Sequence, residues 1–430
     1  MVLPPVNPLL RSLGNGINGK DSNTIDSAAI TVTSGGDAIR STNDTDAALG
    51  WIRISNSTLE LTAAEDGIQA ETAVVMSSGT YSITTGGGYE GEMADDASAK
   101  GIKAGTAVNL VSGIYTLDCC DDGVHSNGDV TVSGGVYTVS SGDDAFHADE
   151  TLAVDGGEIN ILASYEGLEG TAVNITGGKI ELVSSDDGVN AGGGADGSGF
   201  MGCGGGNNFG STDSNSLVNI TDGYLVVHAG GDGLDSNGSM TMTGGTVIVT
   251  STGRGDGALD YDRSFTLSGG TLLAIGAGSM PQAPSEATQN TVFLNLDTTL
   301  PAGTYLALLG DGREFVSELP VDAANVVFSS PDLKDGATYT VSYGGAYSGD
   351  STDNVCSGGS YSGGTQLTEL TLTESITRYG NASMGGGNRG QMPGGEKPER
   401  PPDGNPDFNK KTLTDPGITS PGNTAAGKVS

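Results

Sequence analysis

A short phrase returns along the middle of this chain at a nearly constant spacing. An acidic residue, then glycine or alanine, then an apolar residue recur with the acidic residue at Asp122, Asp144, Glu166 and Asp187. The position numbers rise by nearly the same amount at each step, which gives a period of about 22 residues. A fixed period of this length indicates an architecture of stacked repeats, in which each repeat packs against its neighbours.

The sequence between these acidic turns predicts strands. Residues 129–133 and 136–139 alternate polar and apolar side chains, and the pair Gly134 and Gly135 separates them, as in short strands joined by a glycine turn. A third short strand at 124–126 completes one period. We therefore predict an all-β fold, a parallel β-helix with about 22 residues and three strands per coil.

Apolar residues at matching places in successive coils should stack into internal ladders. Tyr81, Tyr115 and Tyr137 alternate in phase with neighbouring apolar residues, which favours an internal aromatic ladder over platforms for sugar binding. Ile30 and Ile52 are one such period apart and are predicted to share another ladder.

The repeat divides the chain into four predicted parts. Residues 1–13 are a leader of unclear structure, 14–290 the β-helix, 291–380 a small antiparallel β domain and 381–430 a disordered tail rich in Gly and Pro. The repeat is already under way at Asn15, so we expect an upstream segment with a signal peptide. Insertions at 42–50, 86–99 and 192–215 flank one strand column and predict a binding face, although the glycine-rich 192–210 stretch is equally typical of a mobile loop.

Charge and cysteine content exclude several classes of function. The chain has 53 acidic and 18 basic residues and a net charge of -35, which argues against a nucleic-acid partner. Four cysteines are too few for a disulfide framework, and Cys119 and Cys120 occupy the turn that Ser140 and Ser141 occupy one coil later. We interpret them as small residues of a turn. The sequence has no apolar run of about 18 residues, so it predicts no membrane span.

The stacked acidic turns predict a site for a divalent cation. Carboxylates on successive coils about 5 Å apart repel by about 3 kcal/mol at an effective dielectric constant near 20, which favours a bound counter-charge. Calcium suits several carboxylate oxygens in a flexible shell. In the alternative, each carboxylate accepts hydrogen bonds from turn amides and faces water. The predicted calcium ligands are Asp121, Asp122, Asp143, Asp144, Glu166, Asp186, Asp187 and Asp232.

A second column of polar residues follows the acidic turns and is predicted to face outward. Such mixed hydrogen-bonding side chains along a flat strand can address the hydroxyls and carboxylates of an extended polymer, whereas the alternative is an ordinary polar face. The predicted ligand-binding residues are Arg40, Gln69, Lys103, His125, His147, Glu169 and Asn190, with Lys100 from the acidic-turn position. His125 and His147 could also form a zinc pair, but the sequence shows no third ligand.

These turns resemble those of the carbohydrate-binding domain-containing proteins of anaerobic bacteria, whose architecture is related to that of pectate lyases. The resemblance covers about residues 14–379 and rests on the phrases GDAIRSTND at 36–44, GIQAET at 67–72, KGIKAG at 100–105, YEGLEG at 165–170, DGLDSNG at 232–238 and GALDYD at 257–262. It implies a right-handed parallel β-helix, bound calcium, export from the cell, and binding of plant cell-wall polysaccharides. The chain departs from the family in lacking its upstream portion and in having Ala145 where glycine is usual.

Three functions are compatible with these observations. The resemblance favours non-catalytic, calcium-dependent binding of acidic pectic chains such as polygalacturonate, and of cellulose, by a secreted or cell-surface protein. A calcium-dependent lyase would need a base, for which Lys100 and Lys103 are candidates, but a lysine paired with carboxylates stays protonated. A structural rod could join end to end through unpaired strand edges at 14–20.

Overall fold

The computed structural model describes residues 8–94, 97–192 and 215–380, which form 39 strands and no helix. The all-β prediction is confirmed. Residues 1–7, 193–214 and 381–430 lie outside the described residues, and with them most of the predicted leader, the longest predicted insertion and the predicted tail. No described segment is a helix of the length and apolarity that crossing a bilayer requires.

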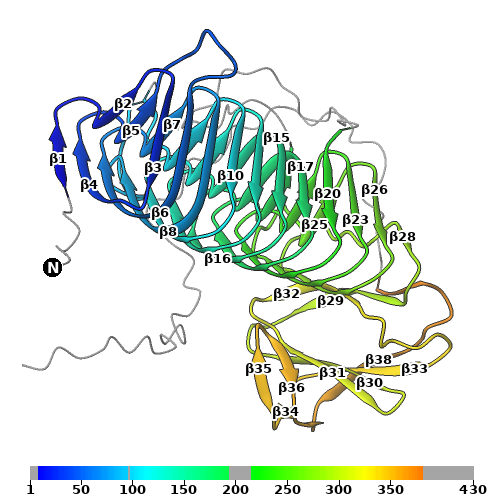
Figure 1. The fold of residues 1–430 in the computed structure, drawn as a ribbon. Helices are drawn as coiled ribbons and strands as arrows, with labels where there is room; N and C mark the ends of the chain where they lie inside the picture. The colour runs from blue at the N-terminus through cyan, green and yellow to red at the C-terminus, as the bar shows by residue number, and fades with distance from the viewer. Residues whose placement is uncertain (1–7, 95–96, 193–214, 381–430) are drawn as a thin grey trace, which may run out of the picture. The chain divides into compact units, whose positions relative to one another are not determined.

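Strands from Leu9 to Ala287 form three columns, in which each strand pairs in parallel with the strand at the same place in the next coil (Figure 1). His125, for example, lies between Lys103 of the preceding coil and His147 of the following one. Pairing is therefore parallel between coils at the predicted spacing.

The column that follows the acidic turns contains β2 (Ile17–Gly19), β5 (Ile39–Ser41), β7 (Ile68–Ala70), β9 (Ile102–Ala104), β12 (Val124–Ser126), β15 (Phe146–Val154), β17 (Leu168–Ile175), β19 (Val189–Ala191), β22 (Leu234–Ser236) and β25 (Leu259–Tyr261). β15 and β17 continue into the second column, which also holds β3 (Ser22–Asp26), β6 (Trp51–Ala63), β8 (Ala73–Thr85), β10 (Ala107–Leu110), β13 (Asp129–Val132), β20 (Leu217–Ile220), β23 (Ser239–Met242), β26 (Ser264–Leu267) and β28 (Glu286–Ala287). β6 and β8 continue into the third, with β1 (Leu9–Ser12), β4 (Ala29–Ser34), β11 (Ile114–Cys119), β14 (Val136–Ser141), β16 (Glu158–Ala163), β18 (Lys179–Ser184), β21 (Tyr224–Ala229), β24 (Thr246–Ser251) and β27 (Thr271–Gly276).

The inward side chains of these columns stack as a continuous core. The ring centroids of Tyr81 and Tyr115 are 4.9 Å apart, those of Tyr115 and Tyr137 are 4.6 Å apart, and all three rings are buried. The predicted internal tyrosine ladder is confirmed. Cys119 is in register with Ser141, and burial raises the pKa of its thiol to about 12, in keeping with its interpretation as a small structural residue.

The ladder predicted for Ile30 and Ile52 is wrong. Ile30 pairs with Leu59, whose partner in the next coil is Tyr81, so Ile30 belongs to the tyrosine ladder. The insertion at 42–50 lengthens this coil, so the true step from Ile30 to its partner is longer than one period. The regular spacing between Ile30 and Ile52 is a coincidence of that insertion.

The strands after the coils are β29 (Thr291–Leu300), β30 (Tyr305–Gly310), β31 (Arg313–Glu318), β32 (Ala323–Ser329), β33 (Thr338–Tyr343), β34 (Ala346–Tyr347), β35 (Asp350–Thr352), β36 (Val355–Ser357), β37 (Tyr361–Ser362), β38 (Thr365–Thr371) and β39 (Ile376–Tyr379). Six of them form a sheet in the order β35-β36-β31-β30-β33-β38, in which every pairing is antiparallel. β32 pairs antiparallel with both β27 and β29, so the large sheet as a whole is mixed. The predicted division at residue 290 stays a prediction.

Candidate metal and ligand site

The acidic turns form a ladder of hydrogen bonds from coil to coil. The side chain at one turn accepts a hydrogen bond from the backbone N–H at the same position of the next coil, as Asp122 Oδ1 does from Asp144 (3.0 Å) and Asp144 Oδ1 from Glu166 (3.1 Å). The same bond joins Asp37 to Asp66, Asp66 to Lys100, Asp187 to Asp232 and Asp232 to Gly257. One oxygen of each of these carboxylates therefore accepts from a turn amide, as in the alternative to a metal site, but Asp37, Asp122 and Asp144 are buried and do not face water as that alternative expected.

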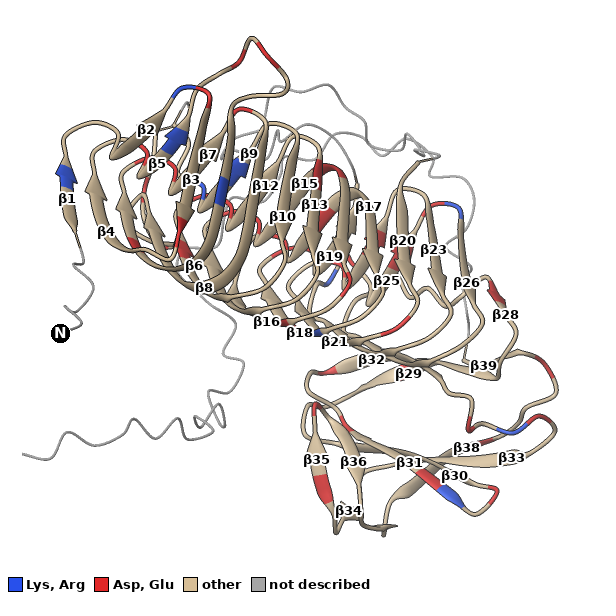
Figure 2. Ribbon diagram, viewed as in Figure 1, with Lys and Arg blue, Asp and Glu red and all other residues tan. Residues whose placement is uncertain are grey.

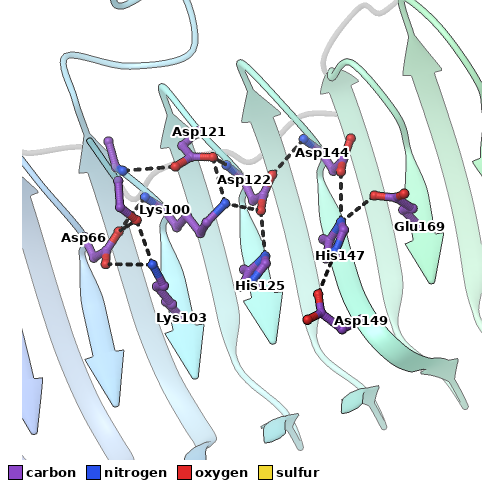
Figure 3. A network of polar contacts seen from close by, with 12 residues as sticks. Asp66, Lys100, Lys103, Asp121, Asp122, His125, Asp144, His147, Asp149 and Glu169 are labelled. Carbon is purple, nitrogen blue, oxygen red and sulfur yellow. Dashed lines mark hydrogen bonds and ion pairs between the residues drawn. The ribbon is translucent and has the colours of Figure 1, made fainter. Parts of the chain in front are cut away.

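The second column of predicted residues lies beside these turns. Strand pairing stacks Arg40, Gln69, Lys103, His125, His147, Glu169, Asn190, Asp235 and Asp260 in one row, hereafter the polar row. Each member follows the turn position by three residues, and the side chains of Arg40, His125 and His147 reach the aspartate of their own turn. Arg40 Nη1 lies 3.2 Å from Asp37 Oδ2, and His125 Nδ1 lies 2.9 Å from Asp122 Oδ2. The predicted metal ligands Asp121, Asp122 and Asp144 thus form one network with Lys100, His125 and His147 of the predicted ligand-binding residues (Figure 3).

Lys100 takes the place of an acidic residue in the ladder and neutralises its neighbours. Its Nζ lies 2.9 Å from Asp121 Oδ1 and 2.6 Å from Asp122 Oδ2, and the residue is 4 % exposed. Burial alone would raise the pKa of Asp122, but Lys100 and then His125 hold it well below its ordinary value. The ammonium group therefore stands where a metal ion would bridge Asp121 and Asp122.

The two histidines are buried rather than outward-facing. His125 and His147 are each 2 % exposed, and their rings stack with centroids 4.9 Å apart. His147 is surrounded by carboxylates: Nδ1 faces Asp144 Oδ2 at 3.1 Å and also Glu169, and Nε2 faces Asp149 Oδ1 at 3.2 Å. Burial alone would lower the pKa of His147, but the hydrogen bonds to Asp144 and Glu169 raise it to about 12. Both ring nitrogens face carboxylates, which favours the protonated form of this buried imidazole.

Asp122 supplies the third ligand that a zinc pair lacked, since one atom each of Asp122, His125 and His147 lies within 4.8 Å of the others. Nδ1 of each histidine already hydrogen-bonds the aspartate three residues before it, however. A metal would have to displace these bonds and the Lys100 ammonium. The arrangement fits charge compensation by the protein's own cations better than it fits zinc.

Further along the polar row, carboxylates gather around one another. Asp232, Asp235 and Asp260 each place one oxygen within 4.8 Å of the others. Asp187, Asp232 and Asp235 make no ion pair with any Lys, Arg or His that the structure describes. Burial, then repulsion from neighbouring carboxylates, raises the pKa of Asp187 to about 9 and that of Asp235 to about 8, and burial raises that of Asp232 to about 7.

This acidic cluster, Asp232, Asp235 and Asp260, suits calcium in donor type and spacing. Calcium binds oxygen at about 2.3–2.6 Å, so two of its ligands lie at most about 5 Å apart. Asp235 and Asp260 were not among the predicted metal ligands. Their position in the repeat could have indicated them. Each lies three residues after the turn position, the place that His147, Glu169 and Asn190 occupy in earlier coils.

The remaining predicted residues lie at the turns and in the polar row of the same coils and their neighbours. Glu166 accepts a hydrogen bond from Asn190 Nδ2 at 2.8 Å, and Lys103 Nζ lies 3.8 Å from Asp66 Oδ2. Gln69 contacts Glu71, Asp143 lies with Asp121 and Asp122, and Asp186 is next to Asp187. Every predicted site residue therefore lies at an acidic turn or in the polar row.

A family model of carbohydrate-binding domain-containing proteins matches residues 9–145 and 144–303. The two regions together cover the stacked coils and more than half of the 430 residues. The chain therefore belongs to the family of carbohydrate-binding domain-containing proteins. No curated protein and no solved structure matches it.

Proposed function

We propose that this chain is a non-catalytic protein that binds acidic polysaccharide, such as polygalacturonate, by means of calcium at the bacterial surface. Family membership supports carbohydrate binding in general. The acidic cluster is the observation that carries the calcium proposal. A protein with a net charge of -35 repels a polyanion, so a cation between the two would make their association favourable.

We propose further that the stacked coils form a right-handed parallel β-helix. The three columns of parallel pairs and the regular step between matching strands support this architecture. Such a rod would place the partly exposed members of the polar row, among them Arg40, Lys103 and Asp235, on a straight line along successive coils, about 4.8 Å per coil. A line of this kind fits an extended polymer.

Calcium is proposed at the acidic cluster, away from the Asp122, Asp144 and Glu166 ladder favoured by the sequence. In that ladder Lys100 and His147 already supply positive charge. In the acidic cluster three carboxylates converge, with Gln282 donating a hydrogen bond to Asp260. Calcium held there would keep coordination positions for a uronate carboxylate, since calcium takes about six to eight oxygen ligands.

The absence of catalysis is proposed from the environment of the two candidate bases. Lys100 is buried between two carboxylates, which favour its protonated form. Lys103 Nζ hydrogen-bonds Ser98 and lies near Asp66. We expect no unsaturated product when polygalacturonate and calcium are incubated with the protein. Formation of such a product, followed by its ultraviolet absorbance, would turn the proposal to a lyase.

The calcium bridge is tested by sedimentation of the protein with insoluble polygalacturonate. We expect strong binding in calcium, loss of most of this binding in chelator, and its return with calcium but not with sodium. Asp235→Asn combined with Asp260→Asn should abolish the calcium-dependent binding. Asp262→Asn is the matched control, because this exposed carboxylate lies beside the cluster without belonging to it. Undiminished binding after chelation would refute the bridge.

We also propose that the protein lies at the cell surface or is secreted, and that its copies associate end to end. Each of these proposals has its own test. Fractionation of the source bacterium should recover the protein in the cell-surface or secreted fraction, and recovery in the cytoplasm would refute that location. End-to-end association would appear in light scattering as mass that grows with protein concentration.

A further inference from the structure

The single tryptophan of the chain lies in a hollow on the second strand column, away from the polar row. Trp51 begins β6 and is half-buried, and the hollow has a volume of about 240 Å³. Its other lining residues include Arg53, Thr72, Ala73, Val75 and Thr106. The small residue Ala73 of β8 lines the hollow, and its partner in register on β10 is Ala107.

A cation stands over the aromatic ring in this hollow. The Arg53 guanidinium carbon is 5.5 Å from the centroid of the Trp51 ring, and the Arg53 side chain is exposed. Arg53 makes no ion pair with a carboxylate in the described part of the chain, whereas Arg40, Lys100 and Lys103 each make at least one. In a chain with 53 acidic residues, this guanidinium is open to an external anion.

Hydroxyl groups line the hollow on the other side. The Thr72 hydroxyl donates to the carbonyl of Leu49 at 2.7 Å, and the Thr106 hydroxyl donates to the carbonyl of Thr72 at 2.9 Å. Because each hydroxyl uses its hydrogen internally, its lone pairs remain to accept from a ligand. Two such acceptors suit the hydroxyls of a sugar.

We propose that this hollow is a subsite for one uronate residue of an acidic polysaccharide. The indole offers an apolar face to the C–H groups of a pyranose ring, and a guanidinium binds a carboxylate through two parallel hydrogen bonds. The volume of the hollow is smaller than the roughly 300–1,000 Å³ of pockets for drug-sized ligands, so it suits a single sugar ring. The subsite rests on the proposed carbohydrate binding but needs no calcium, since the cation is Arg53.

Trp51 also reports on the subsite, because it is the only tryptophan. The test is a fluorescence titration of the full chain in chelator, with a short oligogalacturonate and with the neutral oligogalactose of equal length. We expect a saturable change with the acidic oligomer alone. Arg53→Ala should weaken this binding about tenfold, in line with loss of a charge-assisted pair.

Arg378→Ala is the matched control. Its guanidinium also lies over a ring, 5.3 Å from the centroid of Phe293, but that ring is 1 % exposed and cannot meet a ligand. The control should bind like the parent. Trp51→Phe, followed by calorimetry, should weaken binding less than Arg53→Ala, because the ring stack remains in part.

The results separate this subsite from the calcium bridge. Absence of a fluorescence change in chelator, with binding to polygalacturonate intact in calcium, would overturn the subsite and leave the proposed function standing. An equal change with the neutral oligomer, or an equal loss in Arg378→Ala, would overturn the assignment to uronate. Failure of both assays would reject acidic polysaccharide as the ligand altogether.

Discussion

The coils from Asp37 to His147 and those from Asp187 to Asp260 are built from the same repeat but balance their charge differently. In the first group Arg40, Lys100 and His147 each contact a carboxylate of an acidic turn. In the second group the polar row holds Asn190, Asp235 and Asp260, and Asp187 and Asp232 stand at the turn position that Lys100 occupies in the first. Figure 2 shows the basic residues of β5 and β9 within the row of acidic ones.

The comparison separates stacking from binding. The backbone hydrogen bond from one turn to the next exists in both groups, with 3.0 Å for Asp122 and 2.7 Å for Asp187, so an acidic residue at the turn serves the fold in each. The two groups differ in what the second oxygen of each turn carboxylate contacts. It meets a protein cation in the first group. In the second group it pairs with no described Lys, Arg or His, and burial, then repulsion from Asp232 and Asp260, raises the pKa of the neighbouring Asp235 to about 8.

Removal of the buried ammonium should have the largest effect. Lys100→Met leaves Asp121 and Asp122 buried without their counter-charge, and we expect a loss of about 3–5 kcal/mol in the free energy of unfolding. Urea denaturation measures it. Lys103→Met is the control and should cost about 0–1 kcal/mol, because Lys103 is partly exposed and 3.8 Å from its partner. Equal effects of the two substitutions would contradict the role of Lys100 as the buried counter-charge.

One substitution made in the two groups should change stability in opposite directions. Asp122→Asn removes the partner of Lys100 and His125 and should lower the free energy of unfolding by about 2–4 kcal/mol. Asp235→Asn removes repulsion and, in chelator at pH 8, should raise it by about 1–2 kcal/mol. With calcium present, Asp235→Asn should instead reduce the stabilisation by the ion. A loss of stability in both variants in chelator would show that the acidic cluster is compensated in some other way.

The smallest expected effect is a shift of melting temperature with pH. Asp232, Asp235 and Asp187 have pKa values of about 7, 8 and 9 in the folded chain, above the value of about 3.9 for an unfolded aspartate. The native state therefore holds protons that the unfolded state releases, so in chelator stability should fall between pH 5 and 9. Calcium should remove this fall because it replaces the protons.

His147 should add a second fall that calcium does not affect. Its pKa of about 12 lies above that of an unfolded histidine, so its contribution is complete below about pH 6.5 and is lost as the pH rises toward 12. Differential scanning calorimetry of His147→Gln in calcium isolates this part. A melting temperature that does not change with pH in chelator would contradict the raised pKa values of the three aspartates.

The period of the repeat was enough to predict the stacking, the register of the polar row and the tyrosine ladder, because side chains of a parallel strand meet their equivalents in the next coil. It failed for Ile30, where an insertion of unknown size changed the step. It also could not predict the apolar outer face of β21, β24 and β27, where Val226, Ile248 and Leu273 pack with β32 and neighbouring strands. These contacts join residues far apart in the chain.

The candidate site was likewise predicted in part from the repeat and decided in part by the tertiary structure. The acidic turns and the residues three places later were readable from the repeat, since both recur with it. The pairing of their charges was decided by tertiary structure, because Lys100 reaches Asp122 across a coil and His147 meets carboxylates from two coils. Exposure was decided there as well: a polar residue in a repeat can face water or be enclosed by its neighbours, and His125 and His147 are enclosed. Electrostatic energy depends on distance and burial, and the order of residues along the chain determines neither by itself.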